Sequence, residues 1–232
     1  MCRYRLRMLI SIVMPTLNEV VNLPARAAEI ERQRGPWEWI VADGGSSDAT
    51  CDVARRLGAE VIVAPRGRGR QLDAGAAQAR GAVLLFLHAD TSLPAGACEA
   101  VRAAARQAVG GNFALRFDER SSTVRFFEAF YRVQQSIFGV YYGDSAIFVR
   151  VDAYRRIGGF GTQPIMEDYA FVRRLERCGR TRRLRLAVTT SSRRFRGRPL
   201  RMVCRWIAIV VLYRLGIPPT CLARLYRPHA PS

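Results

Sequence analysis

Apolar and polar segments alternate along the first half of the chain in a pattern that predicts strands followed by helices. Short apolar runs, of which Val83–Leu87 is uninterrupted, have the length and composition of strands buried on both faces. The segments between them have helical spacing, and several end at glycine. We predict strands at Met8–Met14, Trp37–Ala42, Glu60–Ala64 and Val83–Leu87, and helices at Asn22–Arg34, Ala49–Leu57, Arg70–Arg80 and Pro94–Val109, the first of them capped by Asn22. Such alternation favours an α/β fold, with a mostly parallel sheet sandwiched by helices.

The second half of the chain is more mixed. Strands are predicted at Asn112–Phe117, Ser145–Val149 and Arg183–Thr189, the first of them antiparallel, and helices at Thr123–Phe138, Asp152–Ile157 and Glu167–Gly179. The apolar segment Trp206–Leu215 is interrupted by Arg214 and is too short to cross a bilayer. It could lie in a membrane interface or pack against the rest of the protein. We expect one domain over residues 8–190 and a basic helical extension over residues 191–232.

The charge of the chain restricts the classes of molecule that it is expected to bind, and its cysteine content indicates the redox compartment. The 232 residues include 37 basic and 19 acidic side chains, for a net charge of +18, and every basic residue is arginine. Arg173–Arg205 holds thirteen arginines and the single acid Glu176. This density indicates a polyanionic partner: nucleotide phosphates, an anionic membrane surface or nucleic acid. The six cysteines form no Cys-x-x-Cys pair, so we expect neither a disulfide framework nor a zinc site, and a reducing cytoplasm is the simpler setting.

Polar tips follow three of the predicted strands. They are Pro15-Thr16-Leu17-Asn18-Glu19, Asp43-Gly44-Gly45-Ser46-Ser47-Asp48 and Leu87-His88-Ala89-Asp90. The first tip directly follows Met8–Met14, and we therefore interpret this short apolar run as a buried strand and not as a signal peptide. In parallel α/β sheets, ligands bind beyond the carboxyl ends of the strands, where all three tips would lie. The alternative for the second tip is an ordinary loop whose Ser47 or Asp48 caps the next helix.

These tips carry groups suited to a nucleotide-linked substrate. Asp43 and the Thr16–Glu19 tip can hold a nucleoside, and Asp90 can ligate a hard divalent cation that bridges two phosphates. His88 is either a further metal ligand or a hydrogen-bonding neighbour. The basic stretch Arg66-Gly67-Arg68-Gly69-Arg70 opens a predicted helix, where backbone N–H groups and guanidinium forks would meet phosphate together. Its alternative interpretation is a flexible basic loop.

A candidate general base lies at the start of a later helix. Glu167 and Asp168 are adjacent carboxylates, and mutual repulsion with partial burial can raise the pKa of one of them into a range useful for accepting a hydroxyl proton. The alternative is that both acids only favour the helix dipole. The preceding loop Gly158–Gly161 is suited to closing over an acceptor.

In this order the motifs resemble family-2 glycosyltransferases of the GT-A fold, over roughly Ile10–Arg198. The resemblance implies a Rossmann-like, mostly parallel central sheet. It implies Asp168 as general base with Glu167 beside it, an acceptor motif at Gly143 and Asp144, and a metal motif at His88 and Asp90. The implied contacts to the nucleotide sugar are Pro15, Thr16, Asn18, Glu19, Asp43, Gly44, Gly45, Ser46, Asp48, Arg66, Gly69, Arg70 and Ala89.

Four segments narrow the resemblance to a bacterial subgroup associated with arsenosugar biosynthesis clusters. They are Arg66-Gly67-Arg68-Gly69-Arg70-Gln71-Leu72, Leu87-His88-Ala89-Asp90, Met166-Glu167-Asp168 and Thr190-Ser191-Ser192-Arg193-Arg194-Phe195. Two positions depart from the broad family: His88 stands where aspartate is frequent, which leaves Asp90 as the only carboxylate of that motif, and Ser145 stands where glutamine is expected.

The resemblance implies inverting transfer by single displacement, from a nucleoside-diphosphate sugar, with UDP favoured, to an unidentified hydroxyl acceptor. It also implies Mn²⁺ or Mg²⁺ as cofactor. We expect a cytoplasmic protein, with peripheral association at the inner face of an anionic membrane as a further partner, and we do not expect nucleic acid. The alternatives are a nucleotidyltransferase of similar fold, which would release pyrophosphate, and a non-enzymatic basic protein that binds membranes or RNA.

Overall fold

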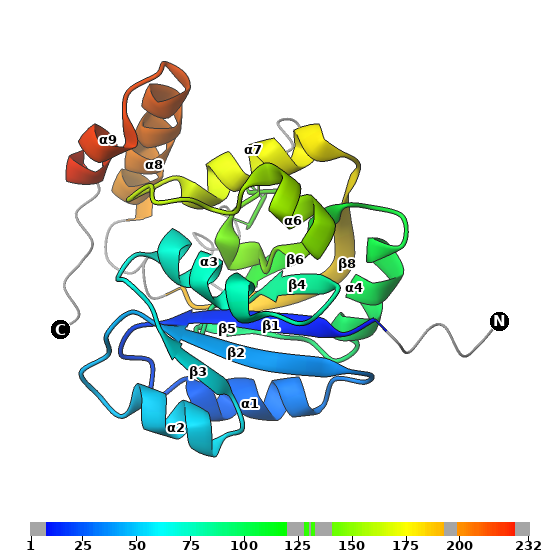
Figure 1. Ribbon diagram of the computed structural model, residues 1–232. Coiled ribbons are helices and arrows are strands. Elements are labelled where there is room, and N and C mark those ends of the chain that lie inside the picture. Colours follow the sequence, from blue (N-terminus) through cyan, green and yellow to red (C-terminus); the bar gives the residue numbers. More distant parts are fainter. Residues whose placement is uncertain (1–7, 120–127, 130, 133–140, 193–198, 226–232) are drawn as a thin grey trace.

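A mixed sheet runs through the molecule, with helices on both of its faces (Figure 1). The computed structural model describes residues 8–119, 128–129, 131–132, 141–192 and 199–225. In this part of the chain the sheet has eight strands in the order β3-β2-β1-β4-β7-β6-β8-β5. Parallel pairs outnumber antiparallel ones, as the sequence predicts.

The first half of the chain forms the parallel part of this sheet. Its elements are β1 (Ile10–Thr16), α1 (Leu23–Glu31), β2 (Trp37–Asp43), α2 (Thr50–Arg56), β3 (Glu60–Val63), α3 (Arg68–Gln78) and β4 (Val83–Phe86). β1 pairs in parallel with β2 and β4, and β2 with β3, so the predicted alternation is confirmed. Helix α3 begins two residues before its predicted start, at Arg68. Asn22 occupies the N-cap position of α1 as predicted, although its side-chain amide donates to Glu19 Oε2 at 2.5 Å and makes no capping bond.

The second half adds the antiparallel pairs. Its elements are β5 (Thr91–Ser92), α4 (Ala97–Ala105), β6 (Gly110–Phe117), the 3₁₀ turn η2 (Gly143–Ser145), β7 (Phe148–Arg150), α6 (Val151–Ile157), α7 (Glu167–Cys178) and β8 (Thr181–Thr190). β6 is antiparallel to β7, as expected, and parallel to β8. The strand predicted from Ser145 begins only at Phe148, because Ser145 ends the 3₁₀ turn and Ala146 has a φ of 50°. Most of the helix predicted at Thr123–Phe138 lies outside the described residues.

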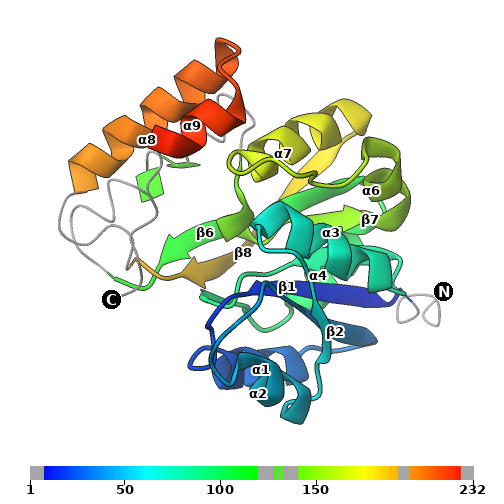
Figure 2. The ribbon, with the colours of Figure 1, turned by 60° about the vertical axis from the view of Figure 1, so that its left-hand side comes forward.

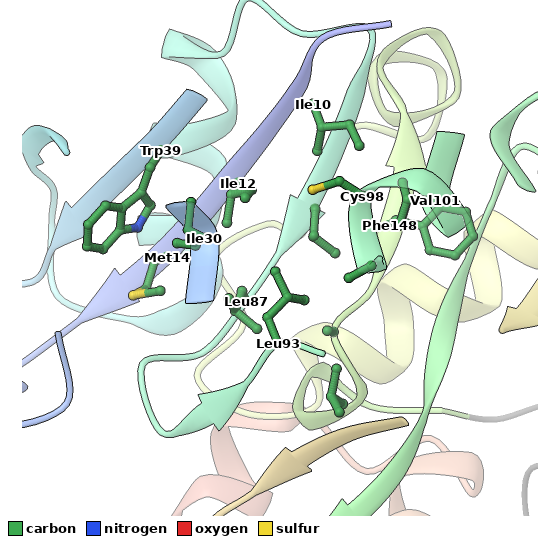
Figure 3. Close-up of a cluster of buried hydrophobic side chains, with 14 of the residues drawn as sticks. Ile10, Ile12, Met14, Ile30, Trp39, Leu87, Leu93, Cys98, Val101 and Phe148 are labelled. Carbon is green, nitrogen blue, oxygen red and sulfur yellow. The ribbon is translucent and has the colours of Figure 1, made fainter. Parts of the chain in front are cut away.

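Alternate side chains of the buried strands build a core on each face of the sheet. Ile10, Ile12 and Met14 of β1 pack with α1 and α4 on one face (Figure 3). Val13 of the same strand packs on the other face with α3, α6 and α7, in a cluster that includes Phe86. Burying one such large side chain stabilises the fold by about 1.5–3 kcal/mol. The two cores fix the carboxyl ends of β1, β2 and β4 at one edge.

Two C-terminal helices, α8 (Pro199–Arg214) and α9 (Pro219–Leu225), lie side by side at one end of the molecule (Figure 2). We call them the α8–α9 extension. Ile209, Val210 and Leu222 of this extension are buried in a cluster with Tyr142 and Tyr169 of the main domain. The sequence left open whether Trp206–Leu215 lies in a membrane interface or packs against the rest of the protein. The helix face that carries Ile209 and Val210 packs against the domain. None of the helices that the structure describes is long and apolar enough to span a membrane.

Candidate functional site

The first two polar tips are joined by hydrogen bonds at the carboxyl edge of the sheet. The Asn18 backbone N–H donates to Ser46 Oγ at 2.8 Å, and Asn18 Oδ1 accepts from the Ser47 N–H at 2.9 Å. Asn18 has a φ of 55°, in the left-handed region that asparagine tolerates better than most residues. Asp48 Oδ1 accepts the Thr50 N–H at 3.0 Å at the start of α2. This bond agrees with the loop interpretation of Asp48, and a contact between Asp48 and a nucleotide sugar stays a prediction.

Asp43 is the centre of this pair of tips. Its side chain is buried, with 1% of the residue exposed. Oδ1 accepts from Thr16 Oγ1 at 3.0 Å and Ser46 Oγ at 2.5 Å, while Oδ2 accepts the N–H groups of Gly45 at 2.9 Å and Ser46 at 2.7 Å. Burial raises the pKa of this carboxyl, but the bonds from Ser46, Thr16 and Gly45 outweigh burial and lower the pKa overall. In this conformation Asp43 shapes the loop that would face a base, since all four of its acceptor positions are used inside the protein.

A cavity of about 260 Å³ opens beside these tips. Its walls are Pro15, Thr16, Leu17, Glu19, Arg68, Gln71, His88, Ala89 and Asp90. The first and third polar tips therefore meet here, at the carboxyl ends of β1 and β4, where a parallel sheet is expected to bind its ligand.

Helix α3 supplies two wall residues, Arg68 and Gln71, which belong to segments identified from the sequence but were not among the individual contacts assigned there. Gln71 Nε2 donates to the carbonyls of Thr16 at 2.8 Å and Ala42 at 2.9 Å, and so ties the ends of β1 and β2 to the helix. A Cβ on Gly44 would lie 3.0 Å from the Gln71 side chain, so this glycine allows the close approach. The two residues are three positions apart in α3, and this spacing places them on one helix face.

The residues predicted from this segment to contact phosphate, Arg66, Gly69 and Arg70, do not line the cavity. Arg66 and Arg70 are exposed, whereas Arg68 lines the cavity. Gly69 is buried, and a Cβ added there would lie 2.6 Å from the Gly161 carbonyl oxygen. The absence of a side chain at Gly69 therefore serves the packing of α3 against the loop before α7.

His88 links the cavity wall to Gly143 and Asp144, the predicted acceptor motif. Its Nδ1 lies 3.2 Å from Asp144 Oδ1, and a Cβ on Gly143 would lie 3.0 Å from its Nε2. Both edges of the ring thus face the 3₁₀ turn of Gly143 and Asp144. This geometry supports the interpretation of His88 as a hydrogen-bonding neighbour of the acceptor motif.

Asp168 lies on the other side of the same turn. Its Oδ2 accepts the Gly143 N–H at 3.0 Å, and its Oδ1 accepts the Tyr169 N–H at 2.7 Å. Neighbouring Glu167 is buried and pairs with Arg68 at 3.5 Å between Oε1 and Nη1. Burial raises the pKa of Glu167, the Arg68 charge opposes this rise, and the Asp168 charge adds to it. The carboxylate pair is thus connected to the cavity through Arg68 on one side and the Gly143 turn on the other.

The glycine-rich loop before α7 is held by Asp73 of α3. Asp73 Oδ1 accepts from Tyr154 Oη at 2.5 Å and from the Phe160 N–H at 2.7 Å, and Oδ2 accepts the Gly161 N–H at 2.8 Å. These bonds anchor the loop that the sequence suggested would close over an acceptor.

The donor set fits a divalent cation only in part. In the described part of the chain, no three His, Cys, Asp or Glu side chains are grouped closely enough to hold a cation by themselves. Asp90, half-buried on the cavity wall, is nevertheless a suitable single ligand, because Mg²⁺ is commonly held by one or two carboxylates together with substrate phosphates. The residues present therefore fit a cation that arrives with a diphosphate.

Comparison with known proteins connects this arrangement to a family of enzymes. The family model described as "Glycosyl transferase family 2" matches residues 11–156. An uncharacterised glycosyltransferase of Mycobacterium tuberculosis is 39% identical over 88 residues, which cover 38% of this chain and 39% of that protein. A PGL/p-HBAD biosynthesis glycosyltransferase of the same species is 41% identical over 91 residues, which cover 36% of each chain. The matches thus span well under half the length of these curated relatives.

Solved structures share the fold at low sequence identity. A mannosyltransferase from Pyrobaculum calidifontis in complex with GDP-Man and Mn²⁺ superposes with a TM-score of 0.61 and 22% identity, over 78% of this chain and 56% of that chain. Glucosyl-3-phosphoglycerate synthase from Mycobacterium tuberculosis, in complex with Mn²⁺, UDP and glucosyl-3-phosphoglycerate, superposes with a TM-score of 0.63 and 20% sequence identity. The superposition covers 91% of this chain and 81% of that chain.

Proposed function

The chain belongs to glycosyl transferase family 2 and has the GT-A fold, and from this premise we propose that it transfers a sugar from a nucleoside-diphosphate sugar to a hydroxyl-bearing acceptor with inversion. Asp168 acts as the general base that takes the acceptor proton. The Thr16 tip on the cavity wall holds the nucleoside together with the Asp43 tip, to which Thr16 is hydrogen-bonded, and Arg68 faces the diphosphate.

One observation carries this proposal: the cavity and the candidate base are connected through a single turn. His88 on the cavity wall contacts Asp144, and the adjacent Gly143 N–H is bound by Asp168. A donor in the cavity and an acceptor at the turn would thus meet next to a carboxylate. The backbone bonds fix the orientation of that carboxylate, which favours efficient proton transfer.

The cavity walls also suit the charge of a leaving nucleoside diphosphate. Asp90 would hold a divalent cation, which supplies neutralisation of the diphosphate when bound. Arg68 contributes a fixed positive charge from the opposite element, and its pairing with Glu167 keeps the guanidinium oriented. We propose Mn²⁺ or Mg²⁺ in this role and favour UDP as the nucleotide.

The finer assignments rest on sequence motifs. We propose membership of the subgroup associated with arsenosugar biosynthesis clusters on the segments Arg66–Leu72, Leu87–Asp90, Met166–Asp168 and Thr190–Phe195, of which residues 193–195 lie outside the described residues. We also propose a cytoplasmic setting, which the free thiols of Cys51, Cys98, Cys178 and Cys221 support. The boundary between the domain at residues 8–190 and the extension at residues 191–232 stays a prediction.

Thermal stability measured against UDP-, GDP-, dTDP- and CMP-linked sugars, with and without Mn²⁺ or Mg²⁺, tests the proposal. A ligand that binds the native state at about a hundredfold excess over its Kd should raise Tm by roughly 5–10 °C. One base should be selected, and the shift should be larger with the cation. Product analysis should then show the nucleoside diphosphate, since pyrophosphate would indicate a nucleotidyltransferase. No shift with any donor would overturn the proposal.

A further inference from the structure

The outward face of the α8–α9 extension exposes a row of aliphatic side chains. Ile207, Val211 and Leu215 have exposed fractions of 41%, 49% and 74%. Their four-residue spacing places them along one side of the helix, and the Leu215 N–H still bonds to the Val211 carbonyl at 3.0 Å. Ile217 and Leu225 are exposed by 39% and 55% in the turn and at the end of α9. A group of exposed aliphatic side chains is typical of a surface that binds a protein or a membrane.

The opposite face of the extension is fixed to the domain, so the exposed row cannot turn inward. The Trp206 ring lies 4.2 Å from the Tyr142 ring, centroid to centroid, and Tyr213 lies 5.5 Å from Tyr169. Arg214 Nε donates to Tyr169 Oη at 2.9 Å. Tyr142 directly precedes the acceptor motif, so the extension is mounted beside the acceptor side of the site.

The charge of the extension indicates an anionic partner. Its two helices contain four arginines and neither Asp nor Glu, and residues 191–232, which include them, contain nine arginines and no acid. Arg205 and Arg224 are exposed on the same two helices as the aliphatic row. Aliphatic side chains combined with arginine on an interfacial helix match the chemistry of a membrane surface that carries anionic lipids.

The same observations disfavour two other occupants. A second copy of the chain would bring two strongly basic extensions together, and like charges repel. A surface that binds single-stranded nucleic acid usually exposes aromatic side chains on which the bases stack. Here Trp206 and Tyr213 instead pack against the cluster with Tyr142 and Tyr169.

We propose that the α8–α9 extension docks this protein on an anionic lipid bilayer through the aliphatic row and the exposed arginines of the same two helices. Tyr142, which directly precedes the Gly143–Asp144 motif, packs on the face of α8 opposite the aliphatic row, so about one helix diameter, roughly 10 Å, would separate it from the bilayer surface. Docking of this kind would favour acceptors presented at the membrane. It does not depend on the transfer reaction, and the two can be tested separately.

Cosedimentation with phosphatidylcholine vesicles, prepared with and without phosphatidylglycerol, measures this docking. The test variant is Ile207→Ser, Val211→Ser, Leu215→Ser in the full chain, and the control is Val21→Ser, Val63→Ser, which removes aliphatic side chains exposed by 85% and 74% on the β1–β3 side of the molecule. All five side chains are substantially exposed, so both variants should fold, and circular dichroism with thermal melting checks this.

We expect the wild-type protein and the control to bind vesicles that contain phosphatidylglycerol, with affinity that falls as salt rises. The triple variant should bind about tenfold or more weakly. Equal binding of the triple variant, absence of binding by the wild type, indifference to phosphatidylglycerol, or a salt-resistant dimer formed through this face would each overturn the proposal. Tighter binding to a single-stranded RNA than to vesicles would do so as well. The donor-induced Tm shift, measured in parallel, reports on the transferase proposal independently.

Discussion

The Gly143 backbone N–H donates a hydrogen bond to Asp168 Oδ2 across 3.0 Å, which joins two motifs separated by 25 residues in sequence. The other carboxylate oxygen accepts the Tyr169 N–H. Asp168 is thus oriented by two backbone donors, and the acceptor motif cannot move without affecting it. This hydrogen bond joins the candidate base directly to the predicted acceptor turn.

Replacing Asp168 with asparagine should abolish turnover while donor binding is retained. A positioned general base contributes about 10²–10⁴ in rate, and an amide cannot take the acceptor proton. The amide NH₂ also cannot accept one of the two backbone N–H groups, so a stability loss of about 1–3 kcal/mol is expected. Steady-state turnover and the donor-induced Tm shift, measured on the same preparation, check both effects. Loss of the Tm shift together with turnover would show a structural role.

Glu167→Gln is the matched control for this experiment. Burial raises the pKa of Glu167, and its carboxylate pairs with Arg68 on the cavity wall. We therefore expect the glutamine variant to weaken donor binding through Arg68 and to keep most of the turnover at saturating donor. If Glu167→Gln removes turnover while Asp168→Asn retains it, the general base is Glu167.

Asp90→Ala should remove the cation-dependent part of the donor-induced stabilisation. Asp90 is the carboxylate of the third tip on the cavity wall, and a cation bound with a diphosphate needs at least one such ligand. The nucleoside part of the site is untouched, so a smaller Tm shift that does not respond to Mn²⁺, Mg²⁺ or EDTA should remain. Asp52→Ala, at an exposed carboxylate on α2, is the control and should behave as the wild type. If the Tm shift of the Asp90 variant still depends on the cation, Asp90 is not the metal ligand, and another carboxylate on the cavity wall, such as Glu19, holds the cation.

Sequence patterns predicted the parallel half of the sheet and the meeting of its polar tips, because both depend on local periodicity. Short elements were harder. β5 has two residues, and the start of β7 was misplaced because Ala146 leaves the extended region at a φ of 50°. Neither feature has a periodic signature in the sequence.

Side-chain roles inside the site depended on a helix boundary. Because α3 begins at Arg68, Arg68 and Gln71 face the cavity three residues apart, while Arg66 and Arg70 are exposed. A start predicted at Arg70 concealed this pairing. The contact of Trp206 with Tyr142 joins residues far apart in the chain and has no local signal.

Asp73→Ala should destabilise the protein by about 2–4 kcal/mol, because it removes the acceptor for one phenol and two backbone N–H groups. The loss releases the loop Gly158–Gly161 from α3. Asp152→Ala is the control: Asp152 pairs with Arg150 at the surface, and its loss should change stability by no more than about 0.5 kcal/mol. Urea unfolding of both variants gives the two values. Equal effects would mean that Asp73 does not hold the loop.

Asp43→Asn should reduce stability at neutral pH, and this reduction should shrink as the solution is acidified. The folded-state pKa of Asp43 lies below its ordinary value of 3.8, because hydrogen bonds from Ser46, Thr16 and Gly45 outweigh the effect of burial. A carboxyl with a depressed folded pKa contributes stability that is fully present above the unfolded pKa and is lost as pH falls through the folded pKa. An asparagine places an NH₂ donor at one of the two oxygen positions, so it cannot accept all four of these hydrogen bonds, and it does not titrate. The difference between the unfolding free energies of the wild type and the variant should therefore be constant above about pH 5 and decrease steadily below about pH 4.

Other carboxyls with lowered pKa values, such as Glu38, are common to both proteins, so their contributions cancel in this difference. A difference that does not change down to the acid transition would show that the Asp43 side chain is not ionised in the folded loop.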